Sequence, residues 1–405
     1  MKLATSSVFG SRCLFSVLSL LATIQFATGQ ASVQGKWTTL SYPTPINPVH
    51  AALLSNGKIL IVAGSGSCPP YLSYCPAGPP YGPGNESGAE LLDPVAGTIT
   101  QYILPWDMFC NAMVVLPDGR PFIMGGTVSY GTYSDPEFTA YNTTATYDPA
   151  TGIFSGQQAM ARGRWYPTAI VLGDGRVMVF SGAIWGQDGH NQNLVGTTNS
   201  TVEFYTVGSG WSQEYPVPTT WTPPMYPRLH LLPNGNVFYS APEPTSALFD
   251  PSDQTWTLDV ATTIYGASRG YGTSVLLPLT PANDYDPRVM ILGGAGVSTS
   301  GNPSTDTTEI IDLGASDLEW KSGPNMSEPR MEMNATILPS GKVLAIGGST
   351  NDEDQTTASL DADLYDPDPV ANTFSSAGVN AYPHLYHSTS LLLSLIHICE
   401  SSASR

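Results

Sequence analysis

Positively charged side chains are scarce in this chain of 405 residues. It holds 15 Lys and Arg against 33 Asp and Glu, a formal net charge of −18, and only 12% of its residues are charged. Lys and Arg supply the counterion release that drives nucleic-acid binding, and the same side chains bind anionic lipid surfaces. The composition therefore argues against nucleic acid and anionic membranes as partners.

Long apolar runs are scarce as well, and the longest lies near the N-terminus. Residues 13–26 are mostly apolar, follow Lys2 and Arg12, and precede small residues. This arrangement predicts a cleavable signal peptide over residues 1–30, and hence a secreted, extracellular protein. A retained membrane anchor is the alternative, disfavoured because the run is shorter than a bilayer span.

Cysteine is the third scarce residue type, with five in the whole chain. Cys13 lies in the predicted signal peptide and Cys399 in the C-terminal tail. Cys68 and Cys75 bracket the loop "CPPYLSYC" and are predicted to form a disulfide in an oxidising compartment. Cys110 is then left without a partner, and burial as a small apolar side chain is its simplest interpretation.

N-x-S/T sequons are frequent by comparison. They permit glycosylation and favour a secretory route behind the predicted signal peptide. The five asparagines are Asn85, Asn142, Asn199, Asn325 and Asn334.

Glycine and proline are abundant, at 40 and 35 residues, and long helical patterns are missing. These two residue types interrupt helices and supply turns, so the composition predicts an all-β protein with many turns.

A repeated unit organises the chain. Each copy has an apolar strand, a polar turn with glycine, and a second apolar strand, which is typical of a β-hairpin. Six copies read "AALLSNGKILIVAG" from 51, "MVVLPDGRPFIMGG" from 113, "AIVLGDGRVMVFSG" from 169, "LHLLPNGNVFYSA" from 229, "SVLLPLTPANDYDPRVMILGG" from 274 and "ATILPSGKVLAIGG" from 335. Outer hairpins alternate with them near residues 91, 146, 248, 310 and 364.

Two hairpins per unit make four strands, and the spacing of roughly 50 to 60 residues is close to the kelch period. Residues 388–393 resemble the strand that would open a further unit, but "SLIHIC" stands where the turn is expected. We therefore predict a seven-bladed kelch-type β-propeller over residues 31–393, with the last blade incomplete. A β-sandwich is the weaker alternative, because it does not explain the repeat length.

Aligning the units on their turns shows which residues enter each inner strand at the same place. Inner strands line the channel of a propeller, so these side chains are expected to converge near its axis. They are Pro48, Cys110, Tyr166, Tyr226, Tyr271, Glu332 and His387.

Tyrosines at strand starts commonly pack between blades with bonded hydroxyls, and we assign that role to Tyr226 and Tyr271. The convergence of further tyrosines with His387 and the odd Cys110 is different, because imidazole and phenolate oxygen suit Cu(II). A bound divalent cation also lowers the pKa of a coordinated hydroxyl, so that a phenol can bind as phenolate.

Three stretches resemble one family in combination: "WDMFCNAMVVLPDGRPFIMGG", "RGRWYPTAIVLGDGRVMVFSG" and "LYHSTSLLL". They are similar to the galactose oxidase and glyoxal oxidase family of copper radical oxidases, and the likeness runs from about Trp37 to Leu393. "RWYP" favours the glyoxal oxidase side.

The resemblance implies a copper ion and a protein-derived cofactor. Cys110 and Tyr166 would form a thioether cross-link, with Tyr166 as the radical and a copper ligand. Tyr386 would be the axial tyrosinate and proton acceptor, and His387 an equatorial ligand. A secreted monomer would then oxidise small aldehydes or primary alcohols, including carbohydrates, and reduce O2 to hydrogen peroxide.

The chain departs from this family at its end. Family members complete the copper site with a His from a β-sandwich domain, which is absent here, and residues 394–405 form an anomalous tail. His397 in that tail does not match the missing ligand. Trp185 is a candidate for an aromatic residue stacking on the cross-link, and His190 for a substrate contact, although loop positions explain both. The activity of the chain as written is left open.

Two other functions compete with the oxidase. A catalytically silent kelch propeller could bind glycan or protein through its loops. A sugar hydrolase with paired carboxylates ranks last, because Glu332 is the only carboxylate in the axial register.

Overall fold

The structure is a computed structural model that describes most of the chain between residues 36 and 393. Residues 42–43, 45, 47, 65–87, 103, 105, 130–136, 188–197 and 296–303 lie outside the description. The predicted signal peptide, the tail and the proposed Cys68–Cys75 disulfide also lie outside the described residues. Among the residues that the structure describes, no helix has the length and hydropathy of a bilayer span.

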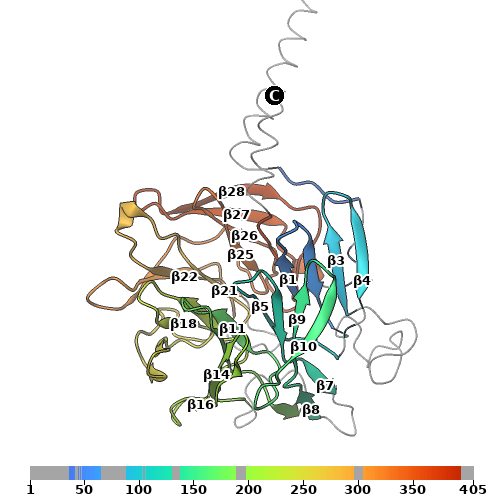
Figure 1. Ribbon diagram of the computed structural model, residues 1–405. Coiled ribbons are helices and arrows are strands. Elements are labelled where there is room, and N and C mark those ends of the chain that lie inside the picture. The colour runs from blue at the N-terminus through green and yellow to red at the C-terminus, as the bar shows by residue number, and fades with distance from the viewer. Residues whose placement is uncertain are drawn as a thin grey trace, which may run out of the picture.

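Six antiparallel sheets of four strands or more are arranged as the blades of a propeller (Figure 1). The first is β1 (His50–Leu53), β2 (Ile59–Val62), β3 (Ala89–Asp93) and β4 (Thr98–Tyr102). The second is β5 (Ala112–Val115), β6 (Pro121–Met124), β9 (Thr144–Asp148) and β10 (Ile153–Gln157). The third is β11 (Thr168–Val171), β12 (Val177–Phe180), β14 (Thr201–Thr206) and β15 (Gly210–Trp211), with β16 (Tyr215–Pro216) beside β14.

The fourth blade is β17 (Arg228–Leu231), β18 (Val237–Ala241), β19 (Ala247–Asp250) and β20 (Thr255–Thr257). The fifth is β21 (Thr273–Leu276), β22 (Arg288–Leu292), β23 (Thr308–Asp312) and β24 (Trp320–Ser322). The sixth is β25 (Asn334–Ile337), β26 (Val343–Ile346), β27 (Asp361–Asp366) and β28 (Thr373–Val379). A small sheet of β7 (Thr127–Ser129), β8 (Glu137–Ala140) and β13 (Trp185–Gln187) joins loops of the second and third blades. Two single 3-10 turns, Pro281–Asn283 and Gln355–Thr357, complete the elements.

The predicted hairpins are confirmed, and their glycines show why the turns require that residue. Gly57 and Gly119 have φ of 78° and 84°, with nothing within 4 Å of an added Cβ. A side chain would therefore fit, and the left-handed backbone alone selects glycine. The outer hairpin of the third blade, β14–β15, turns on "TVGSG" and was missed by the sequence pattern.

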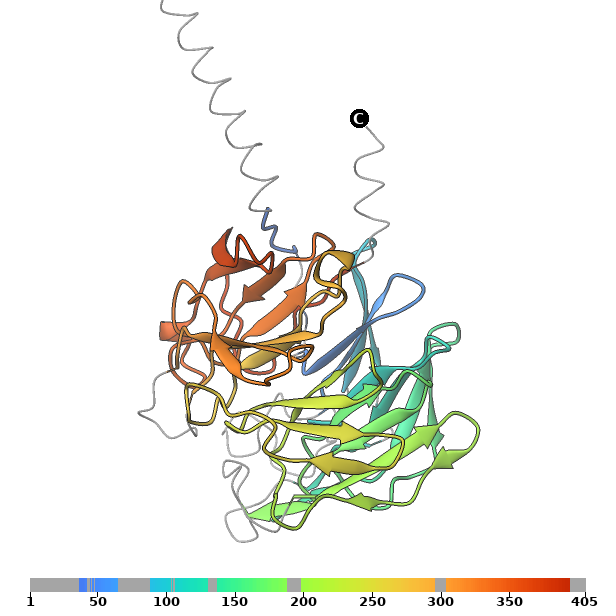
Figure 2. The ribbon, with the colours of Figure 1, turned by 90° about the vertical axis from the view of Figure 1, so that its left-hand side faces the viewer.

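The prediction of seven blades is wrong, because the propeller has six. Residues 388–393 lie between the sixth and first blades, which are side by side in both views (Figures 1 and 2). Thr336 Oγ1 donates to the Ser390 carbonyl oxygen at 3.2 Å, and Thr389 Oγ1 donates to that of Pro48 at 2.5 Å. No described residue pairs with this segment in a β-ladder, so it occupies the place of an inner strand without forming a blade.

The hydrophobic core consists of layers between neighbouring blades. One layer joins Phe180 and Phe204 of the third blade to Val237 and Phe249 of the fourth. Similar clusters join the first blade to the second, the second to the third, the fourth to the fifth and the fifth to the sixth. Each sheet thus buries both faces, which explains why the second strands are continuous apolar runs such as "ILIV" and "VMVF".

Buried ion pairs recur inside three blades. Arg164 pairs with Glu203 at 2.8 Å, Arg269 with Glu309 at 2.7 Å, and Arg330 with Asp363 at 2.9 Å. Each arginine precedes an axial position by two residues and also donates to backbone carbonyl oxygens. These pairs fix the chain that enters the inner strand to the third strand of the same blade.

Candidate functional site

The residues that enter the inner strands share an unusual backbone conformation. Six of the seven positions predicted from the register have positive φ: Cys110 (56°), Tyr166 (58°), Tyr226 (45°), Tyr271 (54°), Glu332 (61°) and His387 (62°). A left-handed conformation costs a non-glycine residue about 1–2 kcal/mol. Such strain persists only where the surroundings enforce it, and it concentrates at functional sites.

Backbone hydrogen bonds link these positions from blade to blade. Tyr166 N donates to the Cys110 carbonyl oxygen at 2.9 Å, and Tyr226 N to that of Tyr166 at 2.8 Å. Glu332 N donates to the Tyr271 carbonyl oxygen at 2.6 Å. The positive φ values turn the chain so that this belt forms around the axis, and the side chains converge inside it.

The four residues singled out from the sequence are brought together at the axis. Tyr166 OH and Tyr386 OH lie 2.5 Å apart, and Cys110 Sγ lies 3.7 Å from His387 Nε2. The rings of Tyr386 and His387 have centroids 3.8 Å apart. Cys110 is fully buried and Tyr166 is 9% exposed. Residues 220 and 277 positions apart in sequence thus form one cluster.

Burial keeps this cluster uncharged. It raises the pKa of the Cys110 thiol and of the Tyr166 and Tyr386 phenols well above their ordinary values. Burial, and to a smaller extent nearby His50, lowers the pKa of His387 to about 3. At neutral pH the cluster therefore offers a neutral imidazole and two neutral phenols.

The donor set fits copper. Two phenol oxygens and one imidazole nitrogen are ligands that Cu(II) accepts, and a divalent cation would favour the phenolate form against the cost of burial. In the described part of the chain no three His, Cys, Asp or Glu side chains are grouped for a metal ion. A metal at this site would therefore depend on the tyrosines.

His50 belongs to the same neighbourhood and was missed by the sequence reasoning. Its Nε2 lies 2.7 Å from the Asn111 carbonyl oxygen and 3.3 Å from Tyr226 OH. Tyr226 OH also donates to that carbonyl oxygen at 3.2 Å, in line with a packing role, although its ring lies 4.5 Å from that of Tyr166. His50 is the second residue after Pro48, so a wider window around each register position would have included it.

Glu332 has an acidic neighbour that the sequence did not reveal. Glu353 N donates to both of its carboxylate oxygens, at 3.2 and 3.3 Å. Burial, then the adjacent Asp352, raises the pKa of Glu332 to about 9. Asp352 lies in the loop between β26 and β27, outside the register, so no alignment of inner strands could predict it.

A cavity of about 200 Å³ opens onto the axial cluster. Its walls include Tyr166, Tyr271, Tyr386, His387, Glu332 and Arg228. Arg228 donates to the Gly272 carbonyl oxygen, and burial lowers its pKa to about 10. Trp185 begins β13 opposite Thr139, but its side chain is not described, and His190 and His397 lie outside the described residues.

The chain matches the sequence model of a family described as "Glyoxal oxidase N-terminus" over residues 87–401. "Putative aldehyde oxidase Art an 7" of Artemisia annua is 27% identical over 326 residues, which are 72% of this chain and 51% of that protein. "Aldehyde oxidase GLOX" of Vitis pseudoreticulata is 25% identical over 393 residues, 90% of this chain and 70% of that protein. The chain thus spans about half the length of the Artemisia relative.

Two solved structures are similar in fold. One is described as a "Novel fungal alcohol oxidase with catalytic diversity among the AA5 family, in complex with copper"; its TM-score is 0.67 at 20% identity, covering 88% of this chain and 70% of that one. The other is YjhT, with a TM-score of 0.52 at 15% identity, covering 84% of this chain and 99% of that one. At these identities the likeness concerns the fold.

Proposed function

Because this chain belongs to the glyoxal oxidase N-terminus family, we propose that it derives from a copper radical oxidase and performs that chemistry at its axial cluster. The substrates would be small aldehydes or primary alcohols, and O2 would be reduced to hydrogen peroxide. The observation that carries the proposal is the 2.5 Å contact between Tyr166 OH and Tyr386 OH, with Cys110 and His387 beside it.

Tyr166, Tyr386 and His387 would hold the copper ion. Cys110 Sγ and the Tyr166 ring would form a thioether bond, with the two displaced hydrogens passing to O2. Bound copper(II) would supply one one-electron acceptor and the cross-linked Tyr166 a second. A primary alcohol, or an aldehyde as its hydrate, would lose two electrons and two protons, which together reduce O2 to hydrogen peroxide.

The chain's own residues would handle the proton and orient the substrate. Tyr386, held as phenolate by bound copper, would take the substrate hydroxyl proton, because it lines the axial cavity and its oxygen lies 2.5 Å from that of Tyr166. Arg228 and protonated Glu332 are among the polar side chains of the cavity wall that can donate hydrogen bonds to a substrate oxygen. The cavity volume of about 200 Å³ favours small substrates or the end group of a larger one.

Peptide mass spectrometry tests the cofactor. We expect the peptides with Cys110 and Tyr166 to be joined, at a mass two hydrogens below their sum, after the chain is loaded with copper in air. The Cys110→Ser variant is the control and should give separate peptides. Free Cys110 and free Tyr166 in the copper-loaded chain would contradict the oxidase and favour a kelch-type propeller that only binds glycan or protein.

Peroxide formation tests the role of Tyr386. Tyr386→Phe removes the proton acceptor, and we expect turnover to fall by about 10²- to 10⁴-fold, the usual contribution of a general base. Peroxide would be measured with an aldehyde and a primary alcohol as separate substrates. Unchanged turnover in the variant would contradict the role of Tyr386 as proton acceptor. The test of the Cys110–Tyr166 cross-link would not be affected by that result.

Secretion is a further part of the proposal. It rests on the signal-like residues 1–30 and on the sequons, of which Asn325 is exposed in the folded chain. An oxidase outside the cell would meet O2 and release peroxide away from the cytoplasm.

A further inference from the structure

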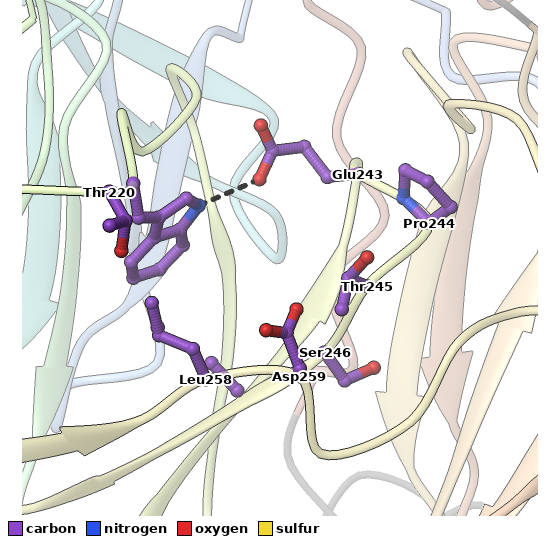
Figure 3. Close-up of a pocket in the computed structure, with 9 residues that line it drawn as sticks. Thr220, Glu243, Pro244, Thr245, Ser246, Leu258 and Asp259 are labelled. Carbon is purple, nitrogen blue, oxygen red and sulfur yellow. Dashed lines mark hydrogen bonds between the residues drawn. The ribbon is translucent and has the colours of Figure 1, made fainter. Parts of the chain in front are cut away.

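A second cavity, of about 340 Å³, is lined by residues of the fourth blade and its loops (Figure 3). Its walls include Thr220 and Trp221, residues 243–246 of the loop between β18 and β19, and Leu258 with Asp259 after β20. Pro242, the neighbour of Glu243, lines the axial cavity. The two cavities therefore flank one loop.

The lining of this second cavity is rich in hydrogen-bond acceptors. Glu243 and Asp259 contribute carboxylates, and Thr245 and Ser246 contribute hydroxyls. None of its lining residues is Lys, Arg or His. The two carboxylates favour a ligand that donates hydrogen bonds and would repel an anion.

Glu243 has one carboxylate oxygen available to such a ligand. Its Oε2 accepts from Trp221 Nε1 at 2.9 Å and from Tyr239 OH at 3.2 Å. Within the described chain Oε1 accepts no hydrogen bond and no cationic side chain pairs with Glu243. Burial raises the pKa of this carboxyl. Glu243 is half-buried, and Oε1 is not one of the fully buried acceptors that lack a partner, so a ligand hydroxyl can donate to it in exchange for water.

The apolar wall is held rigidly. The Trp221 ring packs against Tyr239 and Trp256, with centroids 5.1 and 5.0 Å apart, and against Phe180 at 5.6 Å. Trp221 N also donates to the Pro218 carbonyl oxygen at 3.0 Å. An aromatic face fixed in this way can contact the C–H face of a ring with little loss of side-chain entropy.

We propose that this cavity binds a neutral, hydroxyl-rich ring of the size and chemistry of a monosaccharide unit. Its hydroxyls would donate to Glu243 and Asp259, and its apolar face would lie against Trp221. A cationic ligand is less favoured, because Glu243 Oε2 already accepts hydrogen bonds from Trp221 and Tyr239, and the only other lining carboxylate is that of exposed Asp259. Sugar binding at this cavity does not depend on the proposed oxidase activity, because the cavity shares no lining residue with the axial cavity.

Titration of the full chain with glucose, galactose and xylose, followed by saturation-transfer NMR and calorimetry, tests the site. We expect one of these sugars to bind with a Kd on the order of 1 mM, as befits a single shallow ring site. Glu243→Gln and Asp259→Asn keep side-chain shape and should each weaken binding several-fold. Asp253→Asn, an exposed carboxylate on the β19–β20 turn, is the matched control and should bind as the parent does.

Two further arms decide between outcomes. Tyr386→Phe alters only the axial cavity, so sugar binding that survives this change and fails in Glu243→Gln supports the second site. Binding lost in Tyr386→Phe and kept in Glu243→Gln would place the sugar in the axial cavity and overturn the proposal. Calcium or a diamine binding at Glu243, with no response to any sugar, would overturn it as well.

Discussion

At the scale of single residues, the asparagines of the N-x-S/T sequons differ in their exposure and hydrogen bonding. Asn199 is fully buried, and Asn142 and Asn334 donate their amide nitrogens to Met160 and Ser388. Asn325 is exposed, and among the described residues its side chain makes one hydrogen bond, a surface contact with Asp306 at 3.1 Å. A glycan replaces a hydrogen of the Asn amide, so a modified Asn199 could not pack as observed.

We therefore expect Asn325 to carry a glycan and Asn142, Asn199 and Asn334 to carry none when the chain is expressed in a eukaryotic secretory host. Site-resolved mass spectrometry before and after deglycosylation would measure occupancy. Asn325→Gln should remove that glycan, whereas Asn334→Gln should leave the glycan mass unchanged. Occupancy at Asn199 in folded protein would contradict the packing of that loop.

Glu332 gives a pH dependence of stability with a definite sign. Its pKa is raised from 4.5 to about 9, so between these values the folded chain holds a proton that the unfolded chain has lost. This contribution is fully present below pH 4.5 and is lost as pH rises towards 9. Asp352 and Glu353 are the acidic groups that face Glu332.

Glu332→Gln should therefore flatten the fall in the free energy of unfolding between pH 5 and pH 9. Urea unfolding at several pH values would measure the slope in both proteins. Glu319→Gln, at an exposed surface pair, serves as control and should keep the parental slope. A slope unchanged by Glu332→Gln would mean that another group supplies it.

At the scale of elements, the sequence predicted the hairpins and the axial register, because both depend on local patterns of apolar residues and turn glycines. It missed the buried ion pairs, because Arg164 and Glu203 are 39 positions apart in the sequence and a local residue pattern does not reveal a contact over that distance. It also missed the backbone strain at residues such as Cys110 and Glu332. Left-handed φ at a cysteine or glutamate is imposed by tertiary contacts and opposes local preference.

Glu90 of the first blade is equivalent to the buried glutamates of these ion pairs but has no arginine partner within the part of the chain that the structure describes. It occupies the place in β3 that Glu203 occupies in β14, and Ile46 stands where an arginine would enter. Its Oε2 has no hydrogen-bond partner among the described residues, and burial raises its pKa. The first blade thus lacks the pair that fixes the third, fifth and sixth.

Breaking one buried pair should be costly. Arg269→Ala leaves Glu309 buried without its partner, and we expect the free energy of unfolding to fall by about 3–5 kcal/mol. Arg120→Ala removes a largely exposed pair with Asp118 and should cost less than about 1 kcal/mol. Chemical denaturation of both variants would show the difference, and equal losses would contradict the role of the buried pairs.

At the scale of the whole molecule, closure of the ring depends on residues 388–391. Leu391 packs against the first blade, while Asn334 and Thr336 of the sixth blade bond to Ser388 and Ser390. The blade count could not be obtained from the sequence, because a strand-like segment becomes a blade only when a second strand pairs with it.

Leu391→Asp should loosen this closure and lower the free energy of unfolding by about 1–3 kcal/mol, because it places a charge in an apolar contact. Leu393→Asp is the matched control, since Leu393 is 39% exposed and should tolerate the change. Thermal unfolding would compare the two. Equal midpoints would indicate that the closing segment does not support the ring.

The belt of left-handed residues has one more consequence. Its members run from Cys110 and Tyr166, which enter the second and third blades, to His387, directly before the closing segment. An ion bound by Tyr166, Tyr386 and His387 would link the third blade to the residues directly before the closing segment. Because the ion would bind only the closed ring, its binding would stabilise the ring by mass action. The metal-bound chain would then open less readily at this segment than the metal-free chain.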